Sequence, residues 1–183
     1  MDGNGKLHDL DLSSTELVLY PDSVLREACT PVEKVDEQVR ALVERMFEVM
    51  FSSRGVGLAA PQVGVTVRLF IASPTFRPDD RRVYINPEII AVGGSQDGEE
   101  GCLSFPDISA KIRRYETATI RALNLAGEEF EESGQDLLAR IYQHESDHLD
   151  GRLLVDRMGS LAKLAHRAAL RELEETYRGA VKS

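Results

Sequence analysis

The sequence predicts an α+β domain in which mostly antiparallel sheets pack around a central helix that carries an HExxH motif, with a further helix at the C-terminal end. Helical periodicity of apolar residues is strong in three segments, at about 36–51, 135–149 and 160–178. Short strand-like runs, separated by proline and glycine, fill the interval between the first two helices. The long helical crossovers that a doubly wound parallel sheet needs are missing, which favours antiparallel pairing.

Length and charge limit the possible classes. A chain of 183 residues suits one domain with a core, so we expect residues 17–183 to form a single catalytic domain after a polar extension, 1–16. The net charge of −9 argues against a DNA-binding protein. No apolar run reaches the roughly 20 residues of a membrane span, and the first sixteen residues do not resemble a signal peptide. Cys29 and Cys102 are too few for a disulfide framework, which indicates free thiols in the reducing cytoplasm.

The first elements are a short strand at Leu17–Tyr20 and a helix from about Asp36 to Phe51. Asp36 is a residue type that caps a helix N-terminus, and Ser52, Ser53 and Gly55 end the helix. The predicted apolar stripe consists of Val39, Leu42, Val43, Met46, Phe47 and Met50.

The strand-like runs follow. They are Val67–Ala72, Val83–Ile85, Glu88–Val92 and Thr117–Asn124, and a Gly127-Glu128 turn joins the last of them to a short strand near Phe130. The second helix spans about Gln135–Leu149, where Gly151 suits its C-terminal end. The third helix runs from about Ser160 to Arg178.

The chemistry is concentrated in His144-Glu145-Ser146-Asp147-His148 on the second helix. Residues four apart lie on one helix face, so both imidazoles can reach a single metal ion. Glu145, one residue along, is placed to act as a general base, as in metalloproteases. The alternative is a chance HExxH on a solvated helix.

Two further segments carry candidate site residues. Cys102 could provide the third ligand that a catalytic metal needs, or it could be a buried core residue. Small residues in the stretch 55–62 allow close backbone approach, and the Gln62 amide could donate to an oxyanion. The alternative for this stretch is a tight loop that packs on the sheet.

Together these segments resemble the peptide deformylases, whose motifs read GxGxAAxQ, EGCLS and QHExDHLxG. The matching segments are Gly55-Val56-Gly57-Leu58-Ala59-Ala60-Pro61-Gln62, Glu100-Gly101-Cys102-Leu103-Ser104 and Gln143-His144-Glu145-Ser146-Asp147-His148-Leu149-Asp150-Gly151. Every fixed position matches, and the resemblance covers about residues 17–165.

The resemblance implies that Cys102, His144 and His148 hold one divalent metal ion, with Fe²⁺ expected natively and Zn²⁺, Ni²⁺ or Co²⁺ possible. It also implies hydrolysis of the formyl group of N-formylmethionyl peptides, with release of formate. Glu145 would then be the general base. The Gln62 side chain and the Leu103 backbone N–H would stabilise the oxyanion.

The resemblance further implies that the substrate binds as an added strand. The backbone partners would be Val56 and Gly101, and the bare backbone at Gly57 would allow the approach. The methionine pocket would be lined by Val56, Leu137, Ile141 and the ring of His144. Ser146 and Gly98 depart from the larger residues that many members carry. The first should matter little if it faces away from the metal, and the second should leave the methionine pocket more open on that side.

Two other features are open to either of two interpretations. Glu100 and Arg114 are interpreted either as an ion pair that supports the cysteine loop or as a solvated surface pair. The basic C-terminal helix is interpreted either as an amphipathic helix packed on the domain or as a docking element for the ribosome. We otherwise expect a monomer.

Two other classes compete with the deformylase. A zinc endopeptidase would draw its third ligand from downstream of the motif, where only His166 is available. A non-catalytic metal-binding module would need neither Glu145 nor Gln62, and a structural zinc site tends to have four protein ligands. Cleavage of unformylated peptides would favour the endopeptidase.

Overall fold

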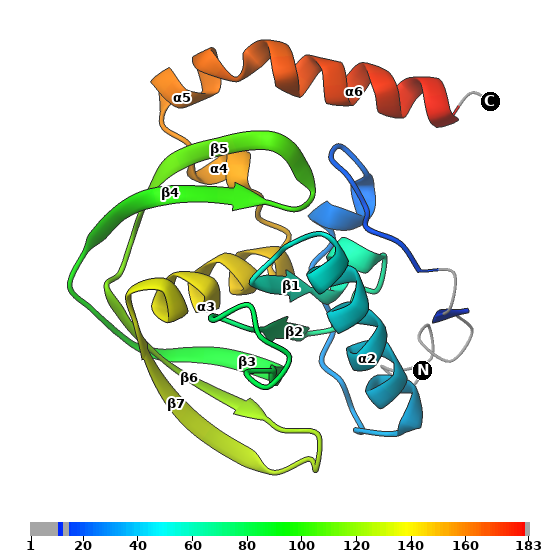
Figure 1. Cartoon of the computed structure of the whole chain (residues 1–183), viewed down its shortest axis with the longest axis vertical. Helices are drawn as coiled ribbons and strands as arrows, with labels where there is room; N and C mark the ends of the chain where they lie inside the picture. Colours follow the sequence, from blue (N-terminus) through cyan, green and yellow to red (C-terminus); the bar gives the residue numbers. More distant parts are fainter. Residues whose placement is uncertain (1–10, 13–14, 182–183) are drawn as a thin grey trace.

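The computed structural model describes residues 11–12 and 15–181. Most of the predicted N-terminal extension, residues 1–10 and 13–14, lies outside these described residues. The fold class is confirmed: the domain combines helices with a five-stranded antiparallel sheet and a two-stranded antiparallel hairpin (Figure 1). Within residues 11–12 and 15–181, no helix is both long enough and apolar enough to cross a membrane.

The five-stranded sheet has the order β1-β2-β3-β6-β7. Its strands are β1 (Gly57–Ala59), β2 (Leu69–Ala72), β3 (Arg82–Gly93), β6 (Thr117–Leu123) and β7 (Glu129–Gln135). The runs predicted at 83–85 and 88–92 are parts of the single strand β3. A register irregularity between Ile85 and Glu88, where Asn86 has a φ of 50°, accommodates Pro87 without ending the strand.

The strand predicted at Leu17–Tyr20 is wrong. This segment has no strand assignment. Two of its backbone hydrogen bonds reach distant parts of the chain: Val18 N–H donates to the Gln62 carbonyl at 2.8 Å, and Tyr20 N–H donates to the Ser104 carbonyl at 2.9 Å. Its partners are a 3-10 turn and a hairpin turn, which offer no continuous strand edge. The segment nevertheless ties these two turns together.

A second, two-stranded sheet was not predicted. It is the hairpin of β4 (Gln96–Cys102) and β5 (Phe105–Arg114). β4 reads Gln-Asp-Gly-Glu-Glu-Gly-Cys and has no apolar alternation, so its sequence gives no strand signal. β5 does alternate, with Ile108, Ala110 and Ile112 buried. The hairpin positions two candidate site residues, because Cys102 ends β4 and Leu103 begins the turn that follows.

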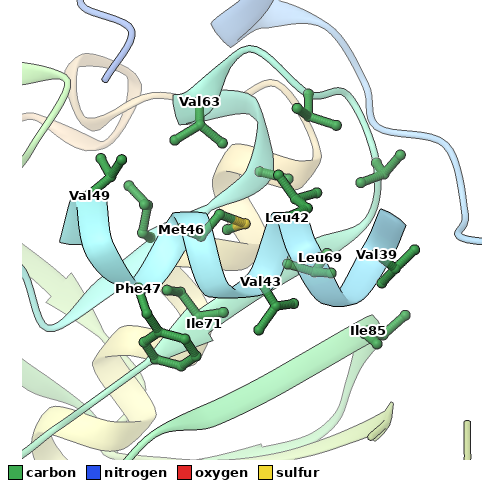
Figure 2. Close-up of a cluster of buried hydrophobic side chains, with 14 of the residues drawn as sticks. Val39, Leu42, Val43, Met46, Phe47, Val49, Val63, Leu69, Ile71 and Ile85 are labelled. Atoms are coloured by element: carbon green, nitrogen blue, oxygen red, sulfur yellow. The ribbon is translucent and has the colours of Figure 1, made fainter. Parts of the chain in front are cut away.

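Helix α2 (Glu37–Ser52) confirms the first predicted helix. The Asp36 carboxylate accepts a hydrogen bond from Val39 N–H at 3.1 Å and so caps the N-terminus. The apolar stripe packs against β2 and β3, where it meets Leu69, Ile71 and Ile85 (Figure 2). This cluster fixes the segment between α2 and β2, which contains β1 and the 3-10 turn η3 (Ala60–Val63).

Helix α3 (Asp136–Leu149) carries the HExxH motif and lies between the five-stranded sheet and the hairpin (Figure 1). Its apolar face, with Ala139 and Tyr142, packs on Phe70 and Tyr84 of the sheet. Gly151 follows the helix with a φ of +69°, as expected for the residue after a C-cap.

The C-terminal segment is not the single helix predicted at 160–178. After α4 (Leu154–Arg157) it forms α5 (Ser160–Ala165) and α6 (Arg167–Val181), with a turn at His166 between them. α6 crosses the outer side of the hairpin (Figure 1), where Ala169, Leu170 and Leu173 pack on a cluster that includes Ile108. The Tyr20 hydroxyl donates to the Glu174 carboxylate at 2.8 Å and anchors α6 to the N-terminal segment.

Candidate metal centre

The structure brings together the three predicted ligands. His144 and His148 lie one turn apart on α3, and Cys102 is the last residue of β4, just before the hairpin turn. One ligand atom from each lies within 4.8 Å of the others. Cys102 Sγ is 3.3 Å from His148 Nε2. Among the described residues, this is the one group of three such side chains that could hold a metal ion.

The donor set fits a divalent transition metal. A thiolate and two imidazoles suit Zn²⁺ or Fe²⁺, and three protein ligands leave a coordination position open, as catalytic sites require. Burial, followed by the nearby charges of His144 and Arg114, holds the pKa of His148 well below its usual value. His148 is therefore neutral, which is the form that binds metals.

His144 is oriented by a carboxylate. Its Nδ1 lies 3.0 Å from Glu100 Oε2, which leaves Nε2 to face the cluster. Burial alone would lower the pKa of His144, but its contacts with Cys102 and Glu100 outweigh burial and raise it. A cation at the cluster would compete with that proton, so metal binding here should release protons.

Glu145 is buried beside the cluster, and its Oε2 has no hydrogen-bond partner among the described residues. Burial raises its pKa to about 7. The space for this side chain depends on Gly57, because a Cβ at that position would lie 2.4 Å from Glu145 Oε1. Gly57 is therefore needed for the carboxylate to occupy its position.

Gln62 comes from η3 and is held at both ends of its amide. Its Oε1 accepts from Ala59 N–H at 3.0 Å, and this bond fixes Nε2 as the end that faces the cluster. Nε2 lies 3.1 Å from Ser104 Oγ and 3.5 Å from Cys102 Sγ. The arrangement places a fixed amide donor beside the open side of the cluster.

A buried ionic network supports the histidines from behind. Arg114 of β5 forms two hydrogen bonds with Glu100, at 2.9 and 3.0 Å, and a third with Asp147 of α3 at 2.6 Å. Arg140 donates to Glu100 at 2.7 Å, and Arg157 pairs with Asp147. Burial would raise the pKa of Glu100, but its contacts with His144 and with Arg114 outweigh burial and hold that pKa well below its usual value. The solvated-pair interpretation of Glu100 and Arg114 is therefore wrong.

A cavity of about 720 Å³ lies in front of the cluster. Its lining includes every predicted site residue except His148, namely Val56, Gly57, Gln62, Gly101, Cys102, Leu103, Leu137, Ile141, His144 and Glu145. Ile141 is buried, whereas Leu137 is 47% exposed at the cavity mouth.

Two strand edges face this cavity. Among the residues that the structure describes, β1 ends the five-stranded sheet and β4 pairs only with β5, so each has one edge without a partner strand. Residues of both edges line the cavity, with Gly57 on one side and Gly101 on the other. An extended peptide could therefore pair with backbone on either side.

The prediction of a pocket opened by Gly98 is wrong. The Arg140 guanidinium lies against Gly98, where a Cβ would come within 2.8 Å of one of its terminal nitrogens. Arg140 also donates to the Ile112 carbonyl at 3.1 Å and to Gln96 at 3.1 Å. The space left by the glycine is thus filled by an arginine that joins α3 to the hairpin.

Sequence reasoning did not single out four residues that complete the site: Ser104, Arg140, Asp147 and Arg157. Asp147 and Ser104 stand inside the matched motifs, which was an available signal. Arg140 precedes His144 by one helical turn and so lies on a neighbouring part of the same face. Arg157 gives no signal, because its approach to Asp147 depends on how α4 packs.

Comparison with known proteins gives a consistent result. The sequence profile described as polypeptide deformylase matches residues 14–164. A peptide deformylase of Acidobacterium capsulatum is 50% identical over 149 residues, which are 80% of this chain and 88% of that protein. A second, of Clostridium botulinum, is 50% identical over 138 residues, covering 75% and 92% of the two chains.

Solved structures agree with this fold. A plant peptide deformylase superposes with a TM-score of 0.90 at 38% identity, covering 93% of this chain and 95% of that one. A peptide deformylase from Legionella pneumophila gives a TM-score of 0.82 at 38% identity, with 92% and 98% coverage.

Proposed function

This chain belongs to the polypeptide deformylase family, an enzyme family, and on that premise we propose that it removes the formyl group from the N-terminal formylmethionine of nascent polypeptides and releases formate. The observation that carries the proposal is the common cavity, in which the Cys102, His144 and Glu145 side chains face two free strand edges. Family membership does not support the endopeptidase or the non-catalytic module.

Cys102, His144 and His148 would hold the metal, with Fe²⁺ as the proposed native ion. The preference for iron comes from the family resemblance, since the donor set suits Zn²⁺ equally. When bound, a divalent ion supplies a Lewis acid that lowers the pKa of a water molecule and so makes a nucleophile available near neutral pH.

Glu145 accepts the proton of the attacking water. Its Oε2 is free for this transfer, and Gly57 gives the carboxylate the room it needs. The water oxygen bonds to the formyl carbon, the carbon–nitrogen bond breaks, and Glu145 delivers the proton to the leaving amine. The products are formate and a free methionyl N-terminus.

The oxyanion that develops on the formyl oxygen needs donors that are in place beforehand. Gln62 Nε2 is one, because Ala59 N–H fixes the amide in the required orientation. The Leu103 backbone N–H, in the hairpin turn next to Cys102, is the proposed second donor.

The peptide would lie as an extra strand between β1 and β4, paired with backbone at Val56 and Gly101. Backbone pairing tolerates many sequences, as a general processing enzyme requires. The methionine side chain would contact Val56, Leu137 and Ile141. Because such substrates arise during translation, the proposed location of the protein is the cytoplasm. The proposed element for docking on the ribosome is α6.

The test is formate release from formyl-Met-Ala-Ser by protein that is purified anaerobically or loaded with Ni²⁺. Glu145→Gln should retain the metal and lose activity by on the order of a hundredfold to ten-thousandfold, while Glu99→Gln at the cavity rim should change little. Acetyl-Met-Ala-Ser tests the requirement for a formyl group, and we expect it to yield no free methionyl N-terminus. Absence of formate release from folded, metal-loaded protein would refute the proposal.

A further inference from the structure

A second cavity, of about 640 Å³, lies on the other side of α3. We call it the rear cavity. It shares no lining residue with the cavity in front of the metal centre. Ser146 follows His144 by two residues and is therefore turned about 200° around the helix from it. Its lining includes Val92, Arg113, Tyr115, Ser146 and Arg152.

The lining carries an excess of positive charge, with four arginines and two aspartates. Both carboxylates are already paired, since Asp147 binds Arg114 and Arg157, and Asp150 binds Arg68 from outside the cavity at 2.9 Å. Glu116 lies against Gly94 at the rim, and positive charge remains in excess even when it is counted.

Two of these arginines have guanidinium N–H groups that are not hydrogen-bonded to described residues. Arg113 donates through Nε to Ser95 Oγ at 2.8 Å, and its terminal nitrogens make no hydrogen bond with described residues. Arg152 has no side-chain hydrogen bond or ion pair among the described residues. Guanidinium groups with free donor pairs match the oxygens of a phosphate.

Ser146 is an independent observation. Ser146 lines the rear cavity, and its Oγ is buried with no hydrogen-bond partner among the described residues. A buried hydroxyl without a partner is costly, and rotation of this short side chain toward the cavity would let a ligand oxygen supply the missing bond. The small serine also keeps the space open, since a longer side chain would extend into it.

The opposite wall is apolar and exposed. Val92 is 45% exposed and Tyr115 is 50% exposed, and both line the rear cavity. A site for a bare anion would not need an aromatic wall, whereas a ligand with a flat ring could stack on the Tyr115 face. The volume is in the range of small-molecule sites.

We propose that the rear cavity binds a phosphate monoester that carries a flat ring, such as a nucleoside monophosphate. Arg113 and Arg152 hold the phosphate, Ser146 Oγ donates to one of its oxygens, and Tyr115 contacts the ring. The site is separate from the deformylase reaction and does not depend on it.

The test is isothermal titration calorimetry on metal-loaded protein with adenosine 5′-monophosphate, inorganic phosphate and adenosine. We expect saturable binding of the monophosphate, weaker binding of phosphate and no detectable binding of adenosine at the same concentrations. Arg152→Gln should weaken binding at least fivefold, and Ser146→Met, which removes the hydroxyl and extends a longer side chain into the cavity, should weaken it at least as much. Arg171→Gln, which changes an exposed arginine of α6, should bind as wild type does.

Formate release by Arg152→Gln and Ser146→Met reports whether these variants are folded. No saturable binding by the wild type at millimolar monophosphate would overturn the proposal. Binding that persists in both variants would place the ligand elsewhere, for example at the metal centre, and would also overturn it. Phosphate that binds as tightly as the monophosphate would overturn the assignment of a ring contact.

Discussion

At the scale of single residues, Gly57 links the backbone of β1 to the position of the proposed base. Because a Cβ at residue 57 would lie 2.4 Å from Glu145 Oε1, Gly57→Ala must displace the carboxylate. A shift of about 1 Å in a reacting group can lower kcat by on the order of a hundredfold. We therefore expect Gly57→Ala to lose formate release to that degree while it retains its metal, measured by kinetics and metal analysis.

Gly159→Ala is the matched control for this prediction. No atom lies within 4 Å of the position of its Cβ, and residue 159 has an ordinary φ of −68°. Wild-type kcat in Gly57→Ala would mean that the Glu145 position is not critical for the reaction.

Cys29, which lies outside the metal centre, shows how burial lowers the reactivity of a thiol. Burial raises the pKa of Cys29 to about 12, with Arg68 opposing the shift. At pH 8 only about one molecule in ten thousand would carry the thiolate, which is the reactive form. We expect Cys29 to resist iodoacetamide in native protein at pH 8, as followed by mass spectrometry of its peptide.

The rate should still rise about tenfold for each pH unit up to pH 10, because this range lies below the pKa and the thiolate fraction grows with pH. Unfolding in urea should expose the thiol and serves as the positive control. Native and unfolded protein that react at the same rate would contradict the prediction.

At the scale of elements, the hairpin and α3 are joined by two arginines that run in opposite directions. Arg114 reaches from β5 to Asp147 of α3, and Arg140 reaches from α3 to Glu100 of β4. The Arg114 side chain is only 5% exposed. Loss of one partner from a buried ion pair costs about 3–5 kcal/mol, because it leaves charge without compensation.

We therefore expect Arg114→Leu to lower the free energy of unfolding of metal-free protein by about 3 kcal/mol. The low end of the range applies because Arg140 and Arg157 still pair with the two carboxylates. Urea denaturation measures the loss. Arg121→Leu, which removes an exposed pair with Glu131 on the sheet, should change stability little, and equal losses in the two variants would refute the role of burial.

The same elements show what the sequence could and could not predict. α2 and α3 follow from apolar periodicity and their C-terminal glycine or serine signals, and the candidate ligands follow from the three motifs taken together, since each motif alone had a structural alternative. β4 could not be predicted, because it has no apolar alternation and its one buried charged residue, Glu100, belongs to a network that exists only when α3 lies beneath the hairpin. The role of Arg140 likewise depends on Gly98, which is distant in sequence and adjacent only in the fold.

At the scale of the whole molecule, the charge is uneven. The chain has a net charge of −9, yet Lys163, Arg167 and Arg171 are exposed at four-residue intervals along α5 and the start of α6. The glutamates of α6, Glu172, Glu174 and Glu175, all follow Arg171. A negatively charged protein that binds RNA must do so through such a local basic surface. This is the physical basis for proposing that α6 docks on the ribosome.

Truncation would not test this docking cleanly. Leu170 and Leu173 of α6 cover the cluster that includes Ile108 and Phe105, so removal of the helix would expose core residues as well as remove charge. Substitution of exposed residues avoids this problem, because a change of charge at the surface leaves the packed face of α6 intact.

We expect the triple variant Lys163→Glu, Arg167→Glu and Arg171→Glu to lose co-sedimentation with 70S ribosomes while it keeps wild-type formate release. The loss should be greatest at low salt, because contacts with phosphates weaken as salt rises. A triple variant that reverses Arg77, Arg81 and Arg121, which are remote from α6, controls for net charge alone. Co-sedimentation that survives reversal on α5 and α6, or that is lost equally in the control, would leave α6 with a purely structural role as the cover of the hairpin.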